Sequence, residues 1–396
     1  MALSKPRAAR QRSSIDRIAY RQGLLDGFKK GHQDGFLRGK EEGARRSGEA
    51  ARHEPQGQPL PSYAEILVIS AGIIPSLEIG VLQPLEALSK LENLRYDVRL
   101  EHEVTEEMIA ASRTVLFVRN VEPAAYALLE KALQLGKRTV YVIDDNFLEL
   151  NPAEPIGQYY SDPARRETFI RFLKNAHMVK VDAPDLGNVI REKYNSNVVY
   201  FPASVDFEWL DRNPKPEKLS GPIIIGYEGS PKEEDFVPVV PALKKILYYY
   251  GGFVRLEFMG FVPSALADHP CVGYEDGGMD YKSFIGKLNQ RQWDIGLAPL
   301  DDNPFNRGKT NNKFREYAAC GIPGIYSSLP IYTSWIDHEQ TGYLVKHTED
   351  GWYEGIKRLI EDVPLRLSIQ EKAYLAARQS FSLEACVDNW KNRILS

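Results

Sequence analysis

Charged side chains gather around residue 310, where an apolar stretch is followed by a polar loop and a helical pattern. In a helix that starts near Thr310, the side chains of Lys309, Lys313 and Glu316 share one face. Two ammonium groups could neutralise a diphosphate, and a carboxylate could accept hydrogen bonds from both hydroxyls of a ribose. The alternative is that these residues form salt bridges on a solvent-exposed helix.

A second candidate site follows an expected strand at 223–227, where the sequence Gly-Tyr-Glu-Gly-Ser-Pro over 226–231 predicts a tight turn. The backbone N–H groups of Gly229 and Ser230 could hold a phosphate, together with a helix expected to begin near Asp235 or Phe236. A glycine at a strand–helix corner is equally typical of a plain turn.

Two adjacent carboxylates, Asp144 and Asp145, come directly after an expected strand at 139–143. One of them could orient or deprotonate a substrate hydroxyl at the end of that strand. The alternative is that they cap the next helix or pair with a lysine.

Apolar strands alternate with helical patterns from residue 64 onward, which predicts parallel sheets covered by helices on both faces. In the first half we expect strands at 65–70, 96–101, 114–119, 139–143, 178–181 and 198–201, and helices at 84–92, 123–135, 165–175 and 185–194. After a linker at 212–222 we expect strands at 223–227, 254–259, 294–298 and 322–326, and helices at 236–249, 281–290, 310–320, 352–360, 364–380 and 383–394. The fold class is therefore α/β, with two doubly wound, Rossmann-like domains and a ligand cleft between their strand ends.

Residues 1–61 differ from the rest of the chain, because glycine recurs at every fourth position from Gly23 to Gly43. We expect a glycine-repeat helix over 14–46 and a proline-rich linker up to residue 61. Glycine costs about 0.8–1 kcal/mol per helical site relative to alanine, so close packing against a second copy or a partner helix would compensate. The alternative is a solvated, charged leader helix.

Composition argues against a general nucleic-acid-binding protein and against a membrane-spanning one. The 396 residues are 43% hydrophobic and 26% charged, and the formal charge is −4, so no general basic excess points to nucleic acid. The apolar stretch at 66–77 is too short to span a membrane, and we expect no transmembrane segment and no secretory signal. Three scattered cysteines give neither a disulfide framework nor a metal site, and they fit a reducing cytoplasm.

Several segments together resemble the group 1 (family four) glycosyltransferases, which have the GT-B fold. The motifs are Asp-Asp at 144–145, the turn at 226–231, Asp-Ile-Gly-Leu-Ala-Pro-Leu at 294–300, Phe-Asn-Arg-Gly-Lys at 305–309, Glu-Tyr at 316–317 with Gly-Ile-Pro at 321–323, and Thr-Gly-Tyr-Leu-Val at 341–345. The resemblance implies an acceptor domain at 62–215, a domain at 216–380 that binds a nucleotide-diphosphate sugar, and a final helix at 381–396 that packs back on the first domain.

The resemblance also assigns roles to residues. Glu316 matches the second of two glutamates of the class, the one that binds the donor ribose, while Gly308 stands where the first is expected. The missing contact to the sugar must then come from Asn306, Lys309 or Asp302. The full set of candidates is Asp144, Asp145 and Asn306 for catalysis, and Gly229, Ser230, Lys232, Lys309, Lys313, Glu316 and Tyr317 for donor binding.

A hexosyl transfer with retained anomeric configuration is what the resemblance implies, without a cofactor and without a metal ion, because cationic side chains and a helix dipole would hold the diphosphate. The acceptor would be a surface polysaccharide precursor, a lipid carrier or a protein, in surface glycan or glycoconjugate synthesis. The place of action would be the cytoplasm, or the periphery of a membrane or an assembly.

Two other functions stay open. Loss of the first glutamate at Gly308 is compatible with a non-catalytic assembly or interaction protein of the same fold, recruited through the helix over 14–46. A nucleotide-sugar epimerase would need acid/base carboxylates and histidines in the cleft, and the sequence does not identify them.

Overall fold

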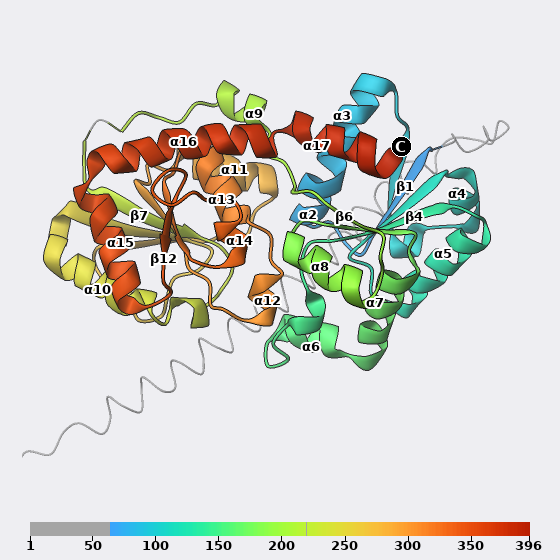
Figure 1. Ribbon diagram of the computed structural model, residues 1–396, viewed down its shortest axis with the longest axis horizontal. Coiled ribbons are helices and arrows are strands. Elements are labelled where there is room, and N and C mark those ends of the chain that lie inside the picture. Colours follow the sequence, from blue (N-terminus) through green and yellow to red (C-terminus); the bar gives the residue numbers. More distant parts are fainter. Residues whose placement is uncertain (1–63, 219) are drawn as a thin grey trace, which may run out of the picture. The chain divides into compact units, whose positions relative to one another are not determined.

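The computed structural model describes residues 64–218 and 220–396, so the expected glycine-repeat helix over 14–46 lies outside the described residues. Two six-stranded parallel sheets, each flanked by helices, confirm the predicted α/β class with two Rossmann-like units (Figure 1).

The N-terminal sheet has the strand order β2-β1-β3-β4-β5-β6. Its strands are β1 (Ile66–Ser70), β2 (Tyr96–Leu100), β3 (Thr114–Val118), β4 (Arg138–Ile143), β5 (Met178–Val181) and β6 (Val198–Tyr200). Every residue of β1, β3 and β5 is buried, which explains why these strands read as continuous apolar runs.

Helices connect these strands in turn, and the predicted ones are found within a few residues of their expected ends. They are α2 (Pro75–Leu77), α3 (Gln83–Glu92), α4 (Glu106–Ala111), α5 (Pro123–Gln134), α6 (Pro155–Ser161), α7 (Pro163–Asn175), α8 (Pro184–Lys193) and α9 (Phe207–Arg212). Proline occupies the first turn of α5, α7 and α8, where no backbone N–H is needed.

The C-terminal sheet has the order β12-β11-β10-β7-β8-β9. Its strands are β7 (Ile223–Glu228), β8 (Val254–Met259), β9 (Val272–Glu275), β10 (Ile295–Ala298), β11 (Gly324–Ser327) and β12 (Tyr343–Val345). Strands β9 and β12 were not predicted, because these short edge strands are only partly buried and carry no continuous apolar run.

The helices of the C-terminal half are α10 (Val239–Tyr250), α11 (Tyr281–Gln290), α12 (Pro304–Arg307), α13 (Asn312–Ala319), α14 (Pro330–Thr333), α15 (Glu349–Glu361), α16 (Val363–Phe381) and α17 (Leu383–Asn389). The helix after β7 was predicted to begin near Asp235 or Phe236, and that prediction is wrong. A 3-10 turn occupies Glu234–Phe236, and α10 begins at Val239, after Pro238. A proline favours the start of a helix because its missing N–H costs nothing there.

The last helix, α17, packs beside α3 on the N-terminal sheet (Figure 1). Trp390, in the π-helical turn that follows α17, is fully buried and donates its indole N–H to the carbonyl of Gly80 at 3.1 Å. Its apolar neighbours include Val68 of β1 and Leu116 of β3, so the chain end completes the core of the first domain.

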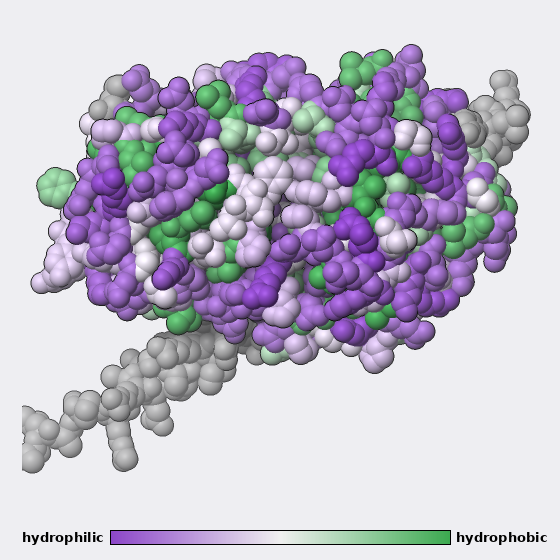
Figure 2. Space-filling view, in the orientation of Figure 1, coloured by the Kyte–Doolittle hydropathy of each residue, from purple (hydrophilic) through white to green (hydrophobic). Residues whose placement is uncertain are grey.

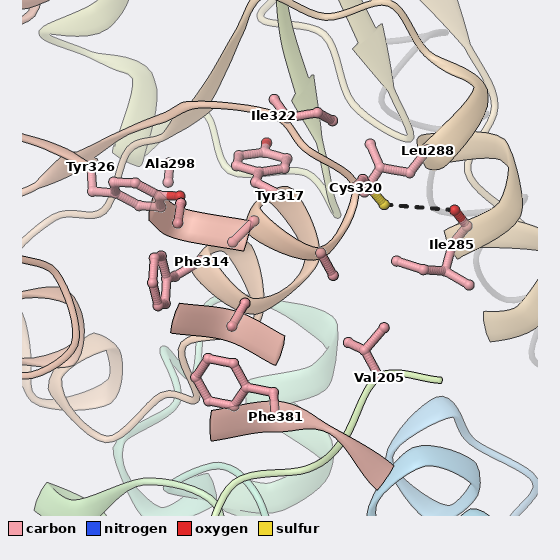
Figure 3. Packing of buried hydrophobic residues seen from close by; sticks show 14 of the residues in the cluster. Val205, Ile285, Leu288, Ala298, Phe314, Tyr317, Cys320, Ile322, Tyr326 and Phe381 are labelled. Carbon is pink, nitrogen blue, oxygen red and sulfur yellow. Dashed lines mark hydrogen bonds between the residues drawn. The ribbon is translucent and has the colours of Figure 1, made fainter. Parts of the chain in front are cut away.

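Apolar side chains fill the space between α13, α16 and the C-terminal sheet. Figure 3 shows Phe314 and Tyr317 of α13 among Tyr326 and Phe381, with the Cys320 thiol near the carbonyl of Ile285 at 3.9 Å. On the molecular face drawn in Figure 2, hydrophilic residues predominate and apolar residues form separate patches. None of the helices in the described ranges is both long and apolar enough to cross a membrane.

Candidate functional site

The turn after β7 is shaped by glycine. Gly229 has a φ of +143°, and a Cβ there would lie 2.8 Å from the hydroxyl of Tyr227 and 3.3 Å from Nζ of Lys313. Gly260, after the neighbouring strand β8, has a φ of +84°, and its Cβ would lie 2.7 Å from the carbonyl oxygen of Gly229. The missing side chain of Gly260 therefore lets the two adjacent strand ends approach each other closely. The backbone N–H of Gly229 donates to the carbonyl of Met259 at 3.0 Å, so it is not free to hold a phosphate, and that prediction is wrong for this group.

Lys313 of α13 points to the end of β7. Its ammonium forms an ion pair with Glu228, which is buried, and lies 5.4 Å from the centre of the Tyr227 ring. The predicted diphosphate ligand Lys313 thus has a fixed position beside Gly229. Glu228 was part of the recognised turn motif, but its role as the buried counter-ion could not be read from the sequence.

The prediction that Lys309 and Lys313 share one helix face is wrong. The helix α12 ends at Arg307 and α13 begins only at Asn312, so Lys309 lies in the segment between them. Its ammonium lies 4.1 Å from the centre of the Phe305 ring. The short helix α12, capped by the side chain of Asn303, replaces the polar loop expected in this region.

Lys232 completes a group of three lysines. Its Nζ lies 3.6 Å from a carboxylate oxygen of Asp235. Burial lowers the pKa of Lys232 to about 8, and the charges of Lys309 and Lys313 also act in this direction. Like charges that lower each other's pKa would be stabilised by an anion placed among them.

Asn306, a predicted catalytic residue, is buried and holds the loop in place. Its side-chain N–H donates to the carbonyl of Asp301 at 2.9 Å and to the carboxylate of Asp235 at 3.2 Å. Asp235 also accepts a hydrogen bond from the backbone N–H of Asp301 at 2.8 Å. Asp235 was not predicted as a site residue, although its position three residues after Lys232 was a usable signal.

Glu316 is a buried carboxylate on the same helix as Lys313. Arg315 donates to it at 3.1 Å. Burial raises the pKa of Glu316 to about 7; the Arg315 guanidinium opposes this shift and the Glu228 carboxylate adds to it. Such a carboxylate could accept hydrogen bonds from a diol, as the sequence predicted.

Two other predicted donor-binding residues lie in different surroundings. Tyr317 lies in the core instead of the cleft: its side chain is fully buried, and its hydroxyl donates to the carbonyl of Leu297 in β10 at 2.9 Å (Figure 3). It therefore holds α13 against the sheet. Ser230, by contrast, is exposed in the turn after Gly229.

Asp144 follows β4, and its carboxylate is paired with an arginine. Arg119, which follows β3, donates two hydrogen bonds to its carboxylate, and its guanidinium lies 5.1 Å from the centre of the Phe147 ring. Burial by itself would raise the pKa of Asp144, but Arg119 holds that pKa below its usual value. Arg119 has a φ of +56°, unusual for a residue with a side chain, and was not predicted as a site residue.

Asp145 differs from its neighbour. Within residues 64–218 and 220–396, its carboxylate has no hydrogen-bond or ion-pair partner within bonding distance. Burial raises its pKa; Lys309 opposes that shift, Asp144 adds to it, and Arg119 and Lys232 oppose it. The Asp145 carboxylate is therefore open and within the electrostatic field of two of the three lysines.

Gly308 lies against the loop that carries these carboxylates. A Cβ at Gly308 would lie 3.1 Å from Cβ of Asn146, and α12 contacts the 3-10 turn at Phe147–Glu149. The space beside Gly308, where the resemblance expects a glutamate side chain, is thus taken by the loop after β4. A small cavity next to this contact is lined by Asp182, Lys309 and Trp335, among others.

In the part of the chain that the structure describes, no group of three or more histidine, cysteine, aspartate or glutamate side chains is arranged to hold a metal ion. The expectation that no metal takes part stays a prediction.

Sequence comparisons give no relatives, since the chain matches no protein-family model and no curated protein. The fold, in contrast, is similar to several solved structures. The UDP-glucose complex of HepE (Alr3699) from Anabaena is 11% identical, with a TM-score of 0.62 over 83% of this chain and 99% of that one. Sucrose-phosphate synthase from Thermosynechococcus elongatus is 13% identical, with a TM-score of 0.60 over 83% and 97%.

A glycosyltransferase from Rickettsia africae is also similar, at 14% identity and a TM-score of 0.59 over 84% of this chain and 98% of that one. Identities this low speak for the shared architecture and not for a shared reaction. The described part of the chain, two Rossmann-like domains closed by a returning C-terminal helix, thus has the GT-B fold of these proteins.

Proposed function

We propose that this protein is a glycosyltransferase that moves a hexosyl group from a nucleotide-diphosphate sugar to an acceptor hydroxyl. The observation that carries the proposal is the group formed by Lys232, Lys309 and Lys313, whose charges act on one another, with Lys313 beside the glycine turn at Gly229. These ammonium groups, whose charges the ion pairs with Glu228 and Asp235 offset only in part, would attract a diphosphate.

The nucleoside would be recognised by Glu316. A buried carboxylate with few partners is costly unless a ligand uses it, and a ribose diol offers two donors. The solved HepE structures, which share the fold, contain UDP-glucose, UDP, or UDP and glucose, which makes a uridine nucleotide the first donor to try.

The acceptor would bind on the other side of the cleft, at the strand ends of the N-terminal sheet, where Asp145 could orient or deprotonate its hydroxyl. Retention of the anomeric configuration and a role in surface glycan or glycoconjugate synthesis are part of the same proposal, and they are supported by the family resemblance of the sequence. The rate would come from stabilising the departing nucleoside diphosphate by the lysines.

The test is a thermal-shift panel of UDP-, GDP-, TDP- and CMP-sugars on the full chain and on the variants Glu316→Ala and Lys309→Ala. A ligand that binds only the folded state stabilises it by about 2.7 kcal/mol at a hundredfold excess over its Kd, which gives a measurable shift. We expect one nucleotide to shift the wild type and both variants to lose most of the shift.

Turnover is measured as release of free nucleotide from the donor that binds, and the anomeric proton coupling of the sugar product reports the stereochemistry. A wild type that binds no nucleotide sugar would contradict the proposal and favour the assembly protein. Binding without any release of nucleotide would favour a non-catalytic member of the fold.

A further inference from the structure

The loop after β4 carries two carboxylates in different states, and one arginine accounts for the difference. Arg119 donates two hydrogen bonds to the carboxylate of Asp144, whereas the carboxylate of Asp145 has no such partner among the described residues. Separate environments for adjacent carboxylates are typical of sites in which only one of them reacts.

Backbone geometry shows that Arg119 is held in place by its surroundings. Its φ of +56° is a left-handed conformation that is strained for a residue with a Cβ. Its backbone N–H donates to the carbonyl of Val142 at 3.1 Å, and its guanidinium lies over Phe147, whose ring is stacked on Tyr160 at 4.3 Å. One side chain thus contacts both ends of the loop at 144–147.

The loop in turn meets the segment of the C-terminal domain around α12. Asn146 packs on Gly308, and Lys309 and Lys232 act on the Asp145 carboxylate. A shift of the loop would therefore change the distance between Asp145 and the lysines that we propose hold the diphosphate.

From this geometry we infer that Arg119 is a positioning residue: by its double hydrogen bond to Asp144 it fixes the loop at 144–147 against Gly308 and so presents the Asp145 carboxylate to the sugar end of the donor. This inference rests on the proposed function. Arg119 itself would touch neither donor nor acceptor, and no bond is made or broken at its side chain.

Arg119→Gln and Asp144→Asn in the full chain test the inference, because the first removes the guanidinium and the second removes the charge of the carboxylate without a change of shape. With UDP-glucose and UDP as probes, we expect UDP affinity within about twofold of wild type and release of UDP from UDP-glucose slowed by about tenfold or more. Arg119→Lys keeps the charge and should recover part of the rate, less than fully because its ammonium cannot form the planar double contact.

The pH profile gives a second readout. The titratable and charged groups around Asp145 are Asp144 and Arg119 on its own sheet, Tyr160 of α6, and Lys309 and Lys232 of the C-terminal domain. Loss of the Arg119 charge raises the pKa of Asp145 further, so the acid limb of the rate should move to higher pH in Arg119→Gln. An unchanged profile together with an unchanged rate would overturn the inference.

Hydrogen exchange tests the positioning without any ligand, and so separates this inference from the proposed function. In the loop, the backbone N–H of Phe147 donates to the backbone carbonyl of Asp145 at 3.1 Å, and that of Glu149 donates to the backbone carbonyl of Asn146 at 3.0 Å. We expect faster exchange over 144–149 and 304–309 in Arg119→Gln. Exchange equal to wild type in both segments would contradict the inference even if no nucleotide sugar is ever found to bind.

The matched control is Arg165→Gln. Arg165 also pairs with a carboxylate, Glu122 at 2.7 Å, and also lies over an aromatic ring, Tyr159 at 4.2 Å, but it belongs to α7 and is not part of the loop at 144–147. We expect it to leave UDP release and exchange over 144–149 within about twofold of wild type. An equal defect in Arg165→Gln would mean that loss of any partly exposed ion pair in this domain slows the reaction, and would refute a special role for Arg119.

Discussion

At the scale of residues, Glu316 and Lys232 have pKa values displaced toward the neutral forms. Burial raises the pKa of Glu316 to about 7 and lowers that of Lys232 to about 8. Groups held in this way lower the stability of the folded protein, and a ligand that pairs with them restores it. A nucleotide with a ribose diol and a diphosphate would supply both partners.

Glu316→Gln is expected to raise the stability of the ligand-free protein while it abolishes the thermal shift by the donor. The folded-state pKa of about 7 exceeds the ordinary value of 4.5, so ionisation of Glu316 costs folded-state stability. We expect a gain of about 1–3 kcal/mol that is full above about pH 7, declines as the pH falls from about 7 to about 4.5 and is absent below that, measured by urea denaturation across this range.

Glu371→Gln is the control for that prediction, because it removes an exposed carboxylate from α16 and should change neither stability nor donor binding. If Glu316→Gln were less stable than wild type at pH 8, the carboxylate would be satisfied within the protein, and the argument for a ligand there would be lost.

At the scale of elements, the site depends on how the strand ends of the C-terminal sheet approach each other. The segments after β7 and β8 meet at Gly229 and Gly260, and the backbone N–H of Gly229 donates to the carbonyl of Met259 at 3.0 Å. Alanine at Gly229 would place a methyl group between Tyr227 and Lys313 in a backbone conformation that suits only glycine.

Gly229→Ala is expected to destabilise the protein by about 1–2 kcal/mol through this strain and to weaken nucleotide binding by about tenfold, since Lys313 must move. Thermal unfolding and a UDP titration measure the two effects. Gly252→Ala serves as the control, because a Cβ there meets nothing within 4 Å and its φ is not positive. Wild-type nucleotide affinity in Gly229→Ala would exclude the turn from the donor site.

At the scale of the whole molecule, the last helix, α17, packs on the N-terminal domain. The helix α16 belongs to the C-terminal half, and α17 returns to the N-terminal sheet, where Trp390 lies among Val68, Leu116 and other core residues. The two domains are thus connected twice, by the linker before β7 and by the passage from α16 to α17.

Trp390→Ala is expected to lower the free energy of unfolding by about 3–5 kcal/mol, as for other large-to-small changes in a core. Trp390→Phe keeps most of the ring but loses the hydrogen bond to Gly80, and should cost about 1–2 kcal/mol. Denaturant unfolding followed by fluorescence and circular dichroism compares the two variants. A loss under about 1 kcal/mol in Trp390→Ala would show that the returning helix contributes little to the first domain.

Local sequence pattern was sufficient for most of the elements. The central strands β1, β3, β4, β7, β8 and β10 were predicted to within one residue at each end, because most of their residues are apolar and buried. The edge strands β9 and β12 and the short helix α12 were missed, since partly exposed strands and one-turn helices carry little periodic signal.

The candidate site divides in the same way. The sequence by itself determined the α/β fold class and placed Gly229 after a strand and Lys313 and Glu316 on one helix, since composition and periodicity act over a few residues. Only the tertiary structure decided that Asn306 and Tyr317 are held by the core, that Arg119 occupies Asp144, and that Asp145 stays open near Lys309. These outcomes depend on burial and on charges that are distant in the chain, and such contacts arise only when both sheets have folded and their strand ends meet.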